Sequence, residues 1–131
     1  MLEEFKKLRQ VEGLRRKLFS DNFFDLYIWY NEKSHIFIGF QLVFSVNDMQ
    51  MALTAEVGKV PNIRKIESGD GEFYSPTDLL DGIGYFPKTA LYNEFKQRSS
   101  TIDGSIRNNV LKVINTYNVR DNKVLKISPL Y

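Results

Sequence analysis

Two neighbouring stretches of sequence decide the fold, Phe24-Asp25-Leu26-Tyr27-Ile28-Trp29-Tyr30 and His35-Ile36-Phe37-Ile38-Gly39-Phe40-Gln41-Leu42-Val43-Phe44. Successive side chains of a β-strand point to opposite faces of the sheet. Both stretches carry apolar side chains on both faces, which is typical of central strands that are covered on each side. Residues 31–34 between them, Asn-Glu-Lys-Ser, predict a hairpin turn. We therefore expect two antiparallel neighbours at the centre of a sheet.

A regular hairpin register assigns each of these side chains to a face. One face is expected to carry Leu26, Ile28, Tyr30, Ile36, Ile38, Phe40, Leu42 and Phe44. The opposite face is expected to carry Asp25, Tyr27, Trp29, Phe37, Gly39, Gln41 and Val43.

Further strands are predicted outward from this hairpin. Residues 49–57 alternate cleanly between apolar and polar side chains, which indicates a strand with one wetter face. Residues 14–19 suit an edge strand, and residues 63–67 suit a shorter strand near an edge. Shorter candidates are residues 72–74, as part of another hairpin, and a last strand at residues 124–127.

Three helices are expected around the sheet. Apolar residues at every third position predict a helix over residues 2–12 that ends at Gly13. Pro87 suits the first turn of a helix to about residue 98, after an irregular crossing segment at residues 75–86. The clearest helix covers residues 104–118, with Thr101 or Asp103 as its cap. Its apolar stripe is Ile106, Val110, Val113, Ile114 and Tyr117.

The order of elements predicts the fold class. Successive strands followed by helices are typical of an α+β domain, and short connections between strands make them antiparallel. We expect a single domain over residues 1–131. It has a central antiparallel sheet of four to six mostly consecutive strands, on which a short N-terminal helix and two C-terminal helices pack.

Composition narrows the class of protein. The chain has 131 residues, of which 43% are hydrophobic, and it contains no cysteine. Without cysteine it has no disulfide, no thiolate nucleophile and no cysteine-based metal site. We expect no signal peptide in the charged N-terminal residues, and no apolar run approaches the ~20 residues that span a bilayer. The expectation is a cytoplasmic protein without a membrane partner.

Charge is unevenly distributed along the chain. Residues 66–87 hold five acids and no base, whereas residues 88–131 hold eight bases against three acids. The net charge of +2 is too small to indicate nucleic-acid binding. The aromatic strands also lack the basic residue and the glycine pattern of an RNA-recognition sheet. The acidic segment is interpreted as solvated surface.

Catalytic, metal and cofactor motifs are not found. His35 is the only histidine, and no nucleophile elbow or phosphate-binding glycine loop accompanies it. The carboxylates of Glu67, Asp70 and Glu72 surround two glycines, but their spacing does not match a calcium loop. We expect no catalytic residue, no metal and no cofactor, and the protein is interpreted as non-enzymatic rather than as an enzyme.

Two polar residues within the apolar strands are the remaining clue to a site. Asp25 and Gln41 fall on the same expected face, and burying either group costs stability unless it is paired. With Asp70 and Glu72 they make up a candidate ligand-binding set. The simpler interpretation is that both are satisfied structural groups, with Asp25 tying a neighbouring loop and Gln41 bonding to backbone.

A resemblance adds to this picture. Four stretches are similar to those of a family of small uncharacterised bacterial proteins, a domain of unknown function: Phe24-Asp25-Leu26-Tyr27-Ile28-Trp29, Gly39-Phe40-Gln41-Leu42, Ala52-Leu53-Thr54 and Asp70-Gly71-Glu72. The similarity covers about residues 10–118. The family pattern places an aromatic residue where this chain has Ala55, and a histidine before Asp-Gly-Glu that this chain lacks. If that histidine and Glu72 form a site in the relatives, this protein has lost part of it. The resemblance implies a self-standing bacterial domain and no particular activity.

The expected function is a non-catalytic binding or protein-interaction domain, whose protein or small-molecule partner the residues do not identify. The alternative is a small-molecule-binding enzyme or sensor with a polar site near Asp25, Gln41 and Asp70–Glu72. The apolar sheet surface exceeds what short helices cover, which favours a homodimer. Alternatively, residues 75–87 fold over that surface and complete a monomer.

Overall fold

The computed structural model describes residues 1–6, 8–10, 12–66, 74–78 and 85–131. Within them the chain forms ten strands and two helices in the following order. These are β1 (Glu3–Phe5), β2 (Leu14–Ser20), β3 (Asp25–Asn31), β4 (Phe37–Val46), β5 (Met49–Glu56), β6 (Asn62–Ile66), β7 (Tyr74–Asp78), β8 (Tyr85–Phe86), α1 (Lys88–Arg98), α2 (Gly104–Thr116), β9 (Arg120–Asp121) and β10 (Ile127–Ser128).

The sheet follows the order of the chain. Strands β1 to β7 lie side by side in sequence order, and each pairs antiparallel with the next. The expected antiparallel hairpin and its position at the centre of the sheet are confirmed. Strand β10 joins β4 beyond the end of β3, where Ile127 lies opposite Val46. A separate pair, β8 with β9, is parallel, which the sequence did not predict.

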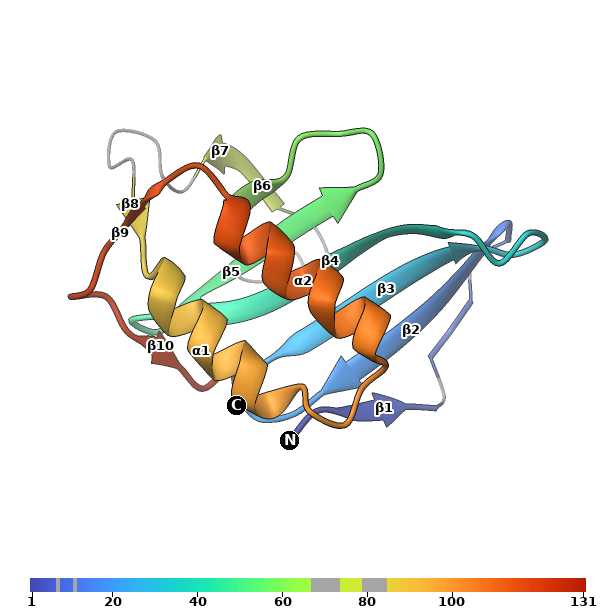
Figure 1. Cartoon of the computed structure of the whole chain (residues 1–131), viewed down its shortest axis with the longest axis horizontal. Helices are drawn as coiled ribbons and strands as arrows, with labels where there is room; N and C mark the ends of the chain where they lie inside the picture. Colours follow the sequence, from blue (N-terminus) through green and yellow to red (C-terminus); the bar gives the residue numbers. More distant parts are fainter. Residues whose placement is uncertain (7, 11, 67–73, 79–84) are drawn as a thin grey trace.

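Both helices cover one face of the sheet (Figure 1). Asp103 caps α2, because its side chain accepts hydrogen bonds from the backbone N–H groups of Ser105 and Ile106. The predicted stripe of α2 is largely confirmed, since Val113 and Tyr117 are half-buried and the rest are buried. The core between helices and sheet includes Leu26, Ile28, Phe40, Leu42, Phe44, Leu53, Ile63, Leu91, Phe95, Val110 and Ile114.

A β-bulge changes the expected faces of the central hairpin. Trp29 lies opposite Gly39, whereas Tyr30 lies opposite Phe37, so residue 38 is an extra residue in β4. Phe37 therefore sits on the helix side, where its ring meets the ring of Tyr30 edge-on at 6.2 Å. The prediction that Phe37 shares a face with Tyr27 and Trp29 is wrong.

The predicted N-terminal helix over residues 2–12 is also wrong. Residues 3–5 form β1 and pair with residues 18–20 of β2. Leu2 is buried at the helix layer, where its N–H donates to the carbonyl of Arg98 at 2.9 Å, while Phe5 is 53% exposed. An isolated helix of three turns is marginal, so pairing of the backbone with β2 is preferred. Consequently β2 is not an edge strand.

The remaining expectations are met in part. Helix α1 and the strands expected at residues 49–57 and 63–67 are present with boundaries shifted by one residue. Residues 74–78 form a strand, although the irregular crossing was expected to begin at residue 75. The last strand lies at Ile127–Ser128 and not at residues 124–127.

Candidate functional site

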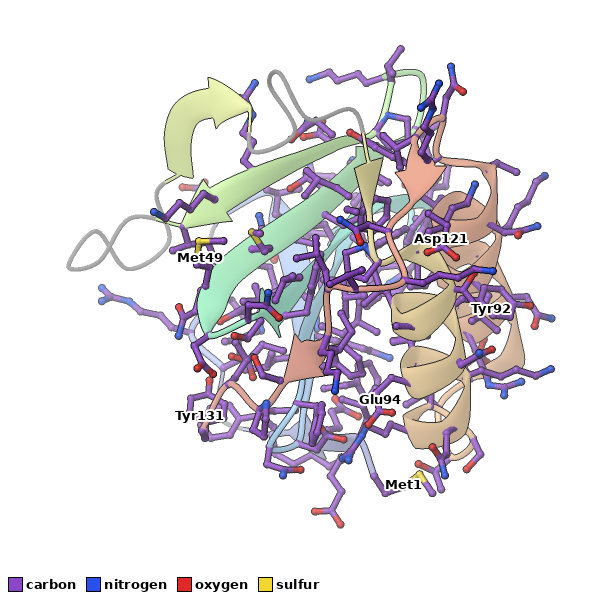
Figure 2. All side chains as sticks on the ribbon, turned by 90° about the vertical axis from the view of Figure 1, so that its left-hand side faces the viewer. Met1, Met49, Tyr92, Glu94, Asp121 and Tyr131 are labelled. Carbon is purple, nitrogen blue, oxygen red and sulfur yellow. The ribbon has the colours of Figure 1, made fainter. Side chains whose placement is uncertain are left out.

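The face of the sheet that points away from α1 and α2 is the candidate functional surface, here called the open face. Figure 2 shows both helices on one side of the sheet, with Tyr92 and Glu94 on α1 and with Tyr131 on the far side. Directly paired residues of antiparallel strands project to the same face, so the register defines the surface. Its side chains form rows that cross the strands, three of which are described below and a fourth of which contains Ser45, Gln50 and Ser128.

Each row is read from the strand pairing. Row one contains Arg16, Trp29, Gly39 and Glu56. Row two contains Phe5, Leu18, Tyr27, Gln41, Thr54 and Asn62. Row three contains Glu3, Ser20, Asp25, Val43, Ala52 and Arg64.

The open face carries apolar and aromatic side chains from its edge strand β1 to β5. Phe5 is 53% exposed, Leu18, Tyr27 and Trp29 are half-buried, and Val43 and Ala52 are buried. Large apolar side chains on a sheet face that no described helix covers are typical of an interaction surface.

Gly39 has no room for a side chain, because β5 lies close to its α-carbon. A Cβ atom at this position would lie 2.5 Å from the carbonyl oxygen of Ala55 and 3.2 Å from Cγ of Glu56. Because Trp29 lies opposite Gly39, the indole and the glycine form an aromatic–glycine pair across β3 and β4. The close approach of β5 explains why glycine stands here.

Asp25 is satisfied by its own chain. The hydroxyl of Ser20 donates to its Oδ1 at 2.5 Å, and the hydroxyl of Tyr131 donates to its Oδ2. Burial, together with the hydrogen bond to Asp25 and the charge of that carboxylate, raises the pKa of Tyr131. Asp25, the first residue of β3, thus holds Tyr131 against this strand. This agrees with the interpretation of Asp25 as a satisfied structural group.

Gln41 also has a partner across the strands. Its Nε2 donates to Oγ1 of Thr54 in β5 at 3.3 Å, so it bonds to a side chain rather than to backbone. Gln41 lies opposite Tyr27, one row from Asp25, so the structure brings the two predicted residues onto one face as diagonal neighbours. Asp70 and Glu72 lie outside the described residues, and a ligand site built from all four stays a prediction.

Three surface cavities lined by described residues lie elsewhere. One of 590 Å³ is lined by residues 120–124, and one of 410 Å³ lies between the N-terminal segment and Thr101. A third, of 260 Å³, lies between Tyr30, Phe37 and the first turns of α2. Neither Asp25 nor Gln41 lines any of these three. Among the described residues, no group of three or more histidine or acidic side chains could hold a metal ion.

His35 lies in the hairpin turn between β3 and β4. It is exposed and has a positive φ of 59°. Its N–H donates to the carbonyl of Asn31 at 2.9 Å, and the side chain of Asn31 accepts from two further N–H groups of the turn. The position is that of a turn residue at the rim of the sheet.

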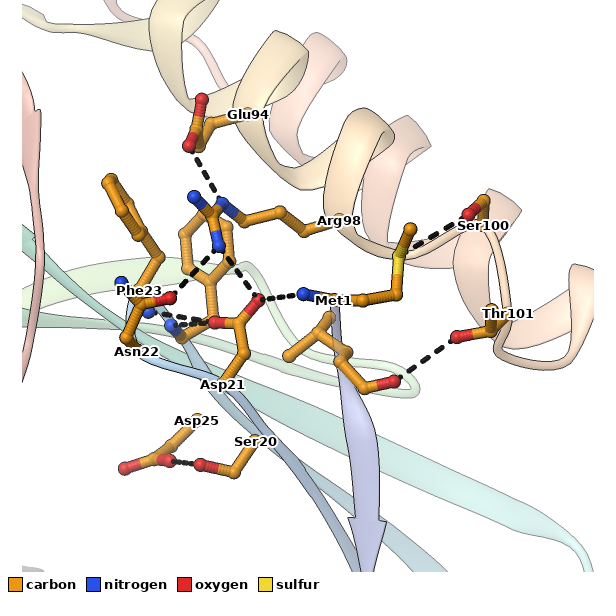
Figure 3. A network of polar contacts seen from close by, with 12 residues as sticks. Met1, Ser20, Asp21, Asn22, Phe23, Asp25, Glu94, Arg98, Ser100 and Thr101 are labelled. Atoms are coloured by element: carbon orange, nitrogen blue, oxygen red, sulfur yellow. Dashed lines mark hydrogen bonds and ion pairs between the residues drawn. The ribbon is translucent and has the colours of Figure 1, made fainter.

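An ion-pair network joins the helix layer to the β2–β3 turn (Figure 3). Arg98 of α1 contacts Oδ2 of Asp21 at 3.2 Å and Oε1 of Glu94 at 2.8 Å, and its guanidinium lies 3.8 Å from the ring centroid of Phe23. Burial alone would raise the pKa of Asp21. Hydrogen bonds from the N–H groups of Phe23 and Phe24 and from Arg98 lower it on balance.

Several of these residues escaped the sequence-based search. Asp21 lies in the turn between β2 and β3, and nothing near it in sequence points to Arg98, its partner 77 positions away. Phe5 was assigned to a helix. Arg16 and Leu18 lie on β2, where residues 14–20 do not alternate cleanly between apolar and polar side chains, so the sequence alone does not assign them to a face.

Two further findings concern membrane-spanning helices and similarity to known proteins. No helix in the described part of the chain is long and apolar enough to cross a membrane. Comparison of the chain with family models, with curated proteins and with solved structures finds no match, so the resemblance to a bacterial family stays a prediction.

Proposed function

We propose that the chain is a non-catalytic protein-interaction domain and that the open face is its binding surface. The observation that carries this proposal is the unequal covering of the sheet. Helices α1 and α2 bury one face, whereas Phe5, Leu18, Tyr27 and Trp29 on the open face keep part of their surface accessible and have no described helix against them. Exposed apolar patches on a domain of this size are typical of interfaces.

The polar groups of the open face support the same function. Asp25 and Gln41, which a ligand would have to bind, already bond to hydroxyls of Ser20, Tyr131 and Thr54. Releasing these bonds would leave polar groups unpaired, at a cost of roughly 1–3 kcal/mol for each buried group. They act as structural ties within a contact surface, and the aromatic side chains of Tyr27 and Trp29 supply the contact area.

Site-directed photo-crosslinking in the cell that makes the protein tests this function. A benzoyl-phenylalanine replaces Phe5 on the open face, and the same analogue replaces Tyr92, which is half-buried on α1, as the matched control. We expect protein adducts at Phe5 and few at Tyr92. Adducts of equal yield at both positions, or none at Phe5, would rule out the open face as the binding surface.

A further inference from the structure

We propose that the cavity between the end of β3, the start of β4 and the first turns of α2, here called the helix-side cavity, binds a small aromatic carboxylate. It has a volume of 260 Å³ and is lined by Tyr30, Phe37, Ser105, Ile106 and Asn109. It lies on the side of the sheet that α1 and α2 cover (Figure 1). The proposal is therefore separate from the protein-binding function of the open face, and either can fail without the other.

The bulge in β4 builds the aromatic wall of the helix-side cavity. In a regular register residue 38 would lie opposite Tyr30, and Phe37 would project to the open face. The extra residue instead places Phe37 opposite Tyr30, where the two rings meet edge-on with their centroids 6.2 Å apart. Bulges recur next to active sites, where they re-aim a side chain. The two rings and the side chain of Ile106 give the cavity an apolar wall.

The volume of the cavity selects a ligand with one ring. An apolar cavity of about 150 Å³ can hold benzene, whereas pockets for drug-sized ligands measure about 300 Å³ or more. At 260 Å³ the helix-side cavity accommodates a six-membered ring that carries a small substituent.

Two polar side chains of the cavity can bind that substituent. Within the described part of the chain, neither the hydroxyl of Tyr30 nor the side-chain amide of Asn109 has a hydrogen-bond partner. Burial, together with the charges of Asp103 and Glu4, raises the pKa of Tyr30, so its hydroxyl keeps its proton at neutral pH. The amide of Asn109 carries two N–H groups. Both side chains can therefore donate hydrogen bonds to a carboxylate.

Two bases stand beside the aromatic wall. Nζ of Lys17 lies 5.5 Å from the centroid of the Tyr30 ring. Arg15 lies directly opposite Tyr30 in the pairing of β2 with β3, so it projects to the same side of the sheet. Among the described residues, no ion pair joins either base to an acid. Both charges are therefore available to an anion at the cavity.

The neighbouring acids are already engaged. The carboxylate of Asp103 caps α2 by accepting from the N–H groups of Ser105 and Ile106 and from the hydroxyl of Ser105, and Lys17 acts on it only as a more distant charge. Glu4 contacts Nζ of Lys6 at 3.4 Å. The charge without a local partner is positive, which favours an anionic substituent on the ring.

An aromatic carboxylate meets these features together. Its ring packs against Tyr30, Phe37 and Ile106. Its carboxylate accepts from the hydroxyl of Tyr30 and the amide of Asn109, and the flexible stem of Lys17 lets the ammonium group turn toward the same oxygens. Hydrogen bonds from a charged donor to a carboxylate are the stronger kind, so charge as well as shape should decide which ligands bind.

Titration of the full-length chain with benzoate, followed by ¹H–¹⁵N correlation spectra, tests the site. We expect the amide signals of residues 37 and 105–109 to shift in a saturable way below about 10 mM benzoate, a concentration that nearly saturates a site with a millimolar dissociation constant. Benzamide has the same ring without the charge, and acetate has the charge without the ring. Each should bind about tenfold more weakly than benzoate.

Three variants assign the binding to the named side chains. Lys17→Met keeps the stem and should weaken benzoate about tenfold without changing the affinity for benzamide. Asn109→Ala should weaken both ligands, because it removes the amide donor. Phe37→Leu keeps an apolar side chain, removes the ring and should also weaken both. The matched controls are Lys112→Met and Asn108→Ala, at exposed positions of α2 that do not line the cavity.

Three results would overturn the proposal. The first is the absence of saturable shifts at residues 37 and 105–109. The second is equal affinity for benzoate and benzamide, which would mean that the bases do not contribute. The third is a loss of benzoate binding in Lys17→Met and Asn109→Ala no larger than in Lys112→Met and Asn108→Ala. Circular dichroism of each variant establishes that a loss of binding is not a loss of fold.

Discussion

The two faces of the sheet are built from the same strands and differ in what lies against them. On the helix side, Phe24 and Phe95 are fully buried, and their rings meet edge-on at 5.8 Å. On the open face, Tyr27 and Trp29 keep part of their surface accessible. Strands that are apolar on both faces need two layers of cover, and the described helices supply one. The difference separates the face that belongs to the folding core from the face that we propose for binding.

The largest expected effect separates the two faces directly. Phe95→Ala removes a fully buried ring from the helix side and should lower the free energy of unfolding by about 3–5 kcal/mol. Tyr27→Ala on the open face should cost roughly 1–2 kcal/mol, because its ring is only partly buried. Urea unfolding at low protein concentration measures both. Equal losses would mean that the open face is packed as tightly as the core.

The next prediction concerns the backbone beneath the open face. Gly39→Ala places a Cβ atom 2.5 Å from the carbonyl oxygen of Ala55, so β4 and β5 must move apart. We expect a loss of about 1–3 kcal/mol, which is typical of overpacking. Gly104→Ala is the control, since no heavy atom lies within 4 Å of the added Cβ. A tolerated Gly39→Ala variant would show that the two strands can separate without cost.

The alternation of side chains along a strand predicts part of the difference between the two faces. It placed Asp25, Tyr27, Trp29 and Gln41 on one face correctly, because each strand is regular at those positions. It failed for Phe37, since the extra residue of a bulge reverses the face of everything beyond it. No pattern in residues 31–39 marks that bulge.

The N-terminal segment shows a second limit. Apolar residues at every third position of residues 2–11 fit a helix, but β1 uses only residues 3–5, and so short a segment has no clear period. Its conformation depends on a partner, the free edge of β2. The partners of Asp25 and Asp21 are likewise distant in sequence, at Tyr131 and Arg98. Tertiary contacts of this kind decide the candidate site, and local pattern does not contain them.

The smallest predicted change in unfolding free energy tests the ion pairs that connect helix α1 to the β2–β3 turn. Arg98→Met removes the ion pairs with Asp21 and Glu94 and keeps much of the side-chain volume. Because Asp21 is only 6% exposed and loses a charged donor, we expect a loss of about 1.5 kcal/mol at neutral pH. Lys96→Met, at an exposed position of the same helix, should change stability by less than about 0.5 kcal/mol.

The pH dependence of this loss identifies its cause. The pKa of Asp21 in the folded protein lies below its ordinary value of 3.8, so its carboxylate stabilises the fold fully above that value and progressively less as pH falls through the lowered pKa. Without Arg98 the pKa of Asp21 moves upward and the variant has less of this stability to lose. Wild type and Arg98→Met should therefore converge in unfolding free energy between about pH 6 and pH 2. A difference that stays constant over that range would assign the effect of Arg98 to its packing on Phe23 rather than to its charge.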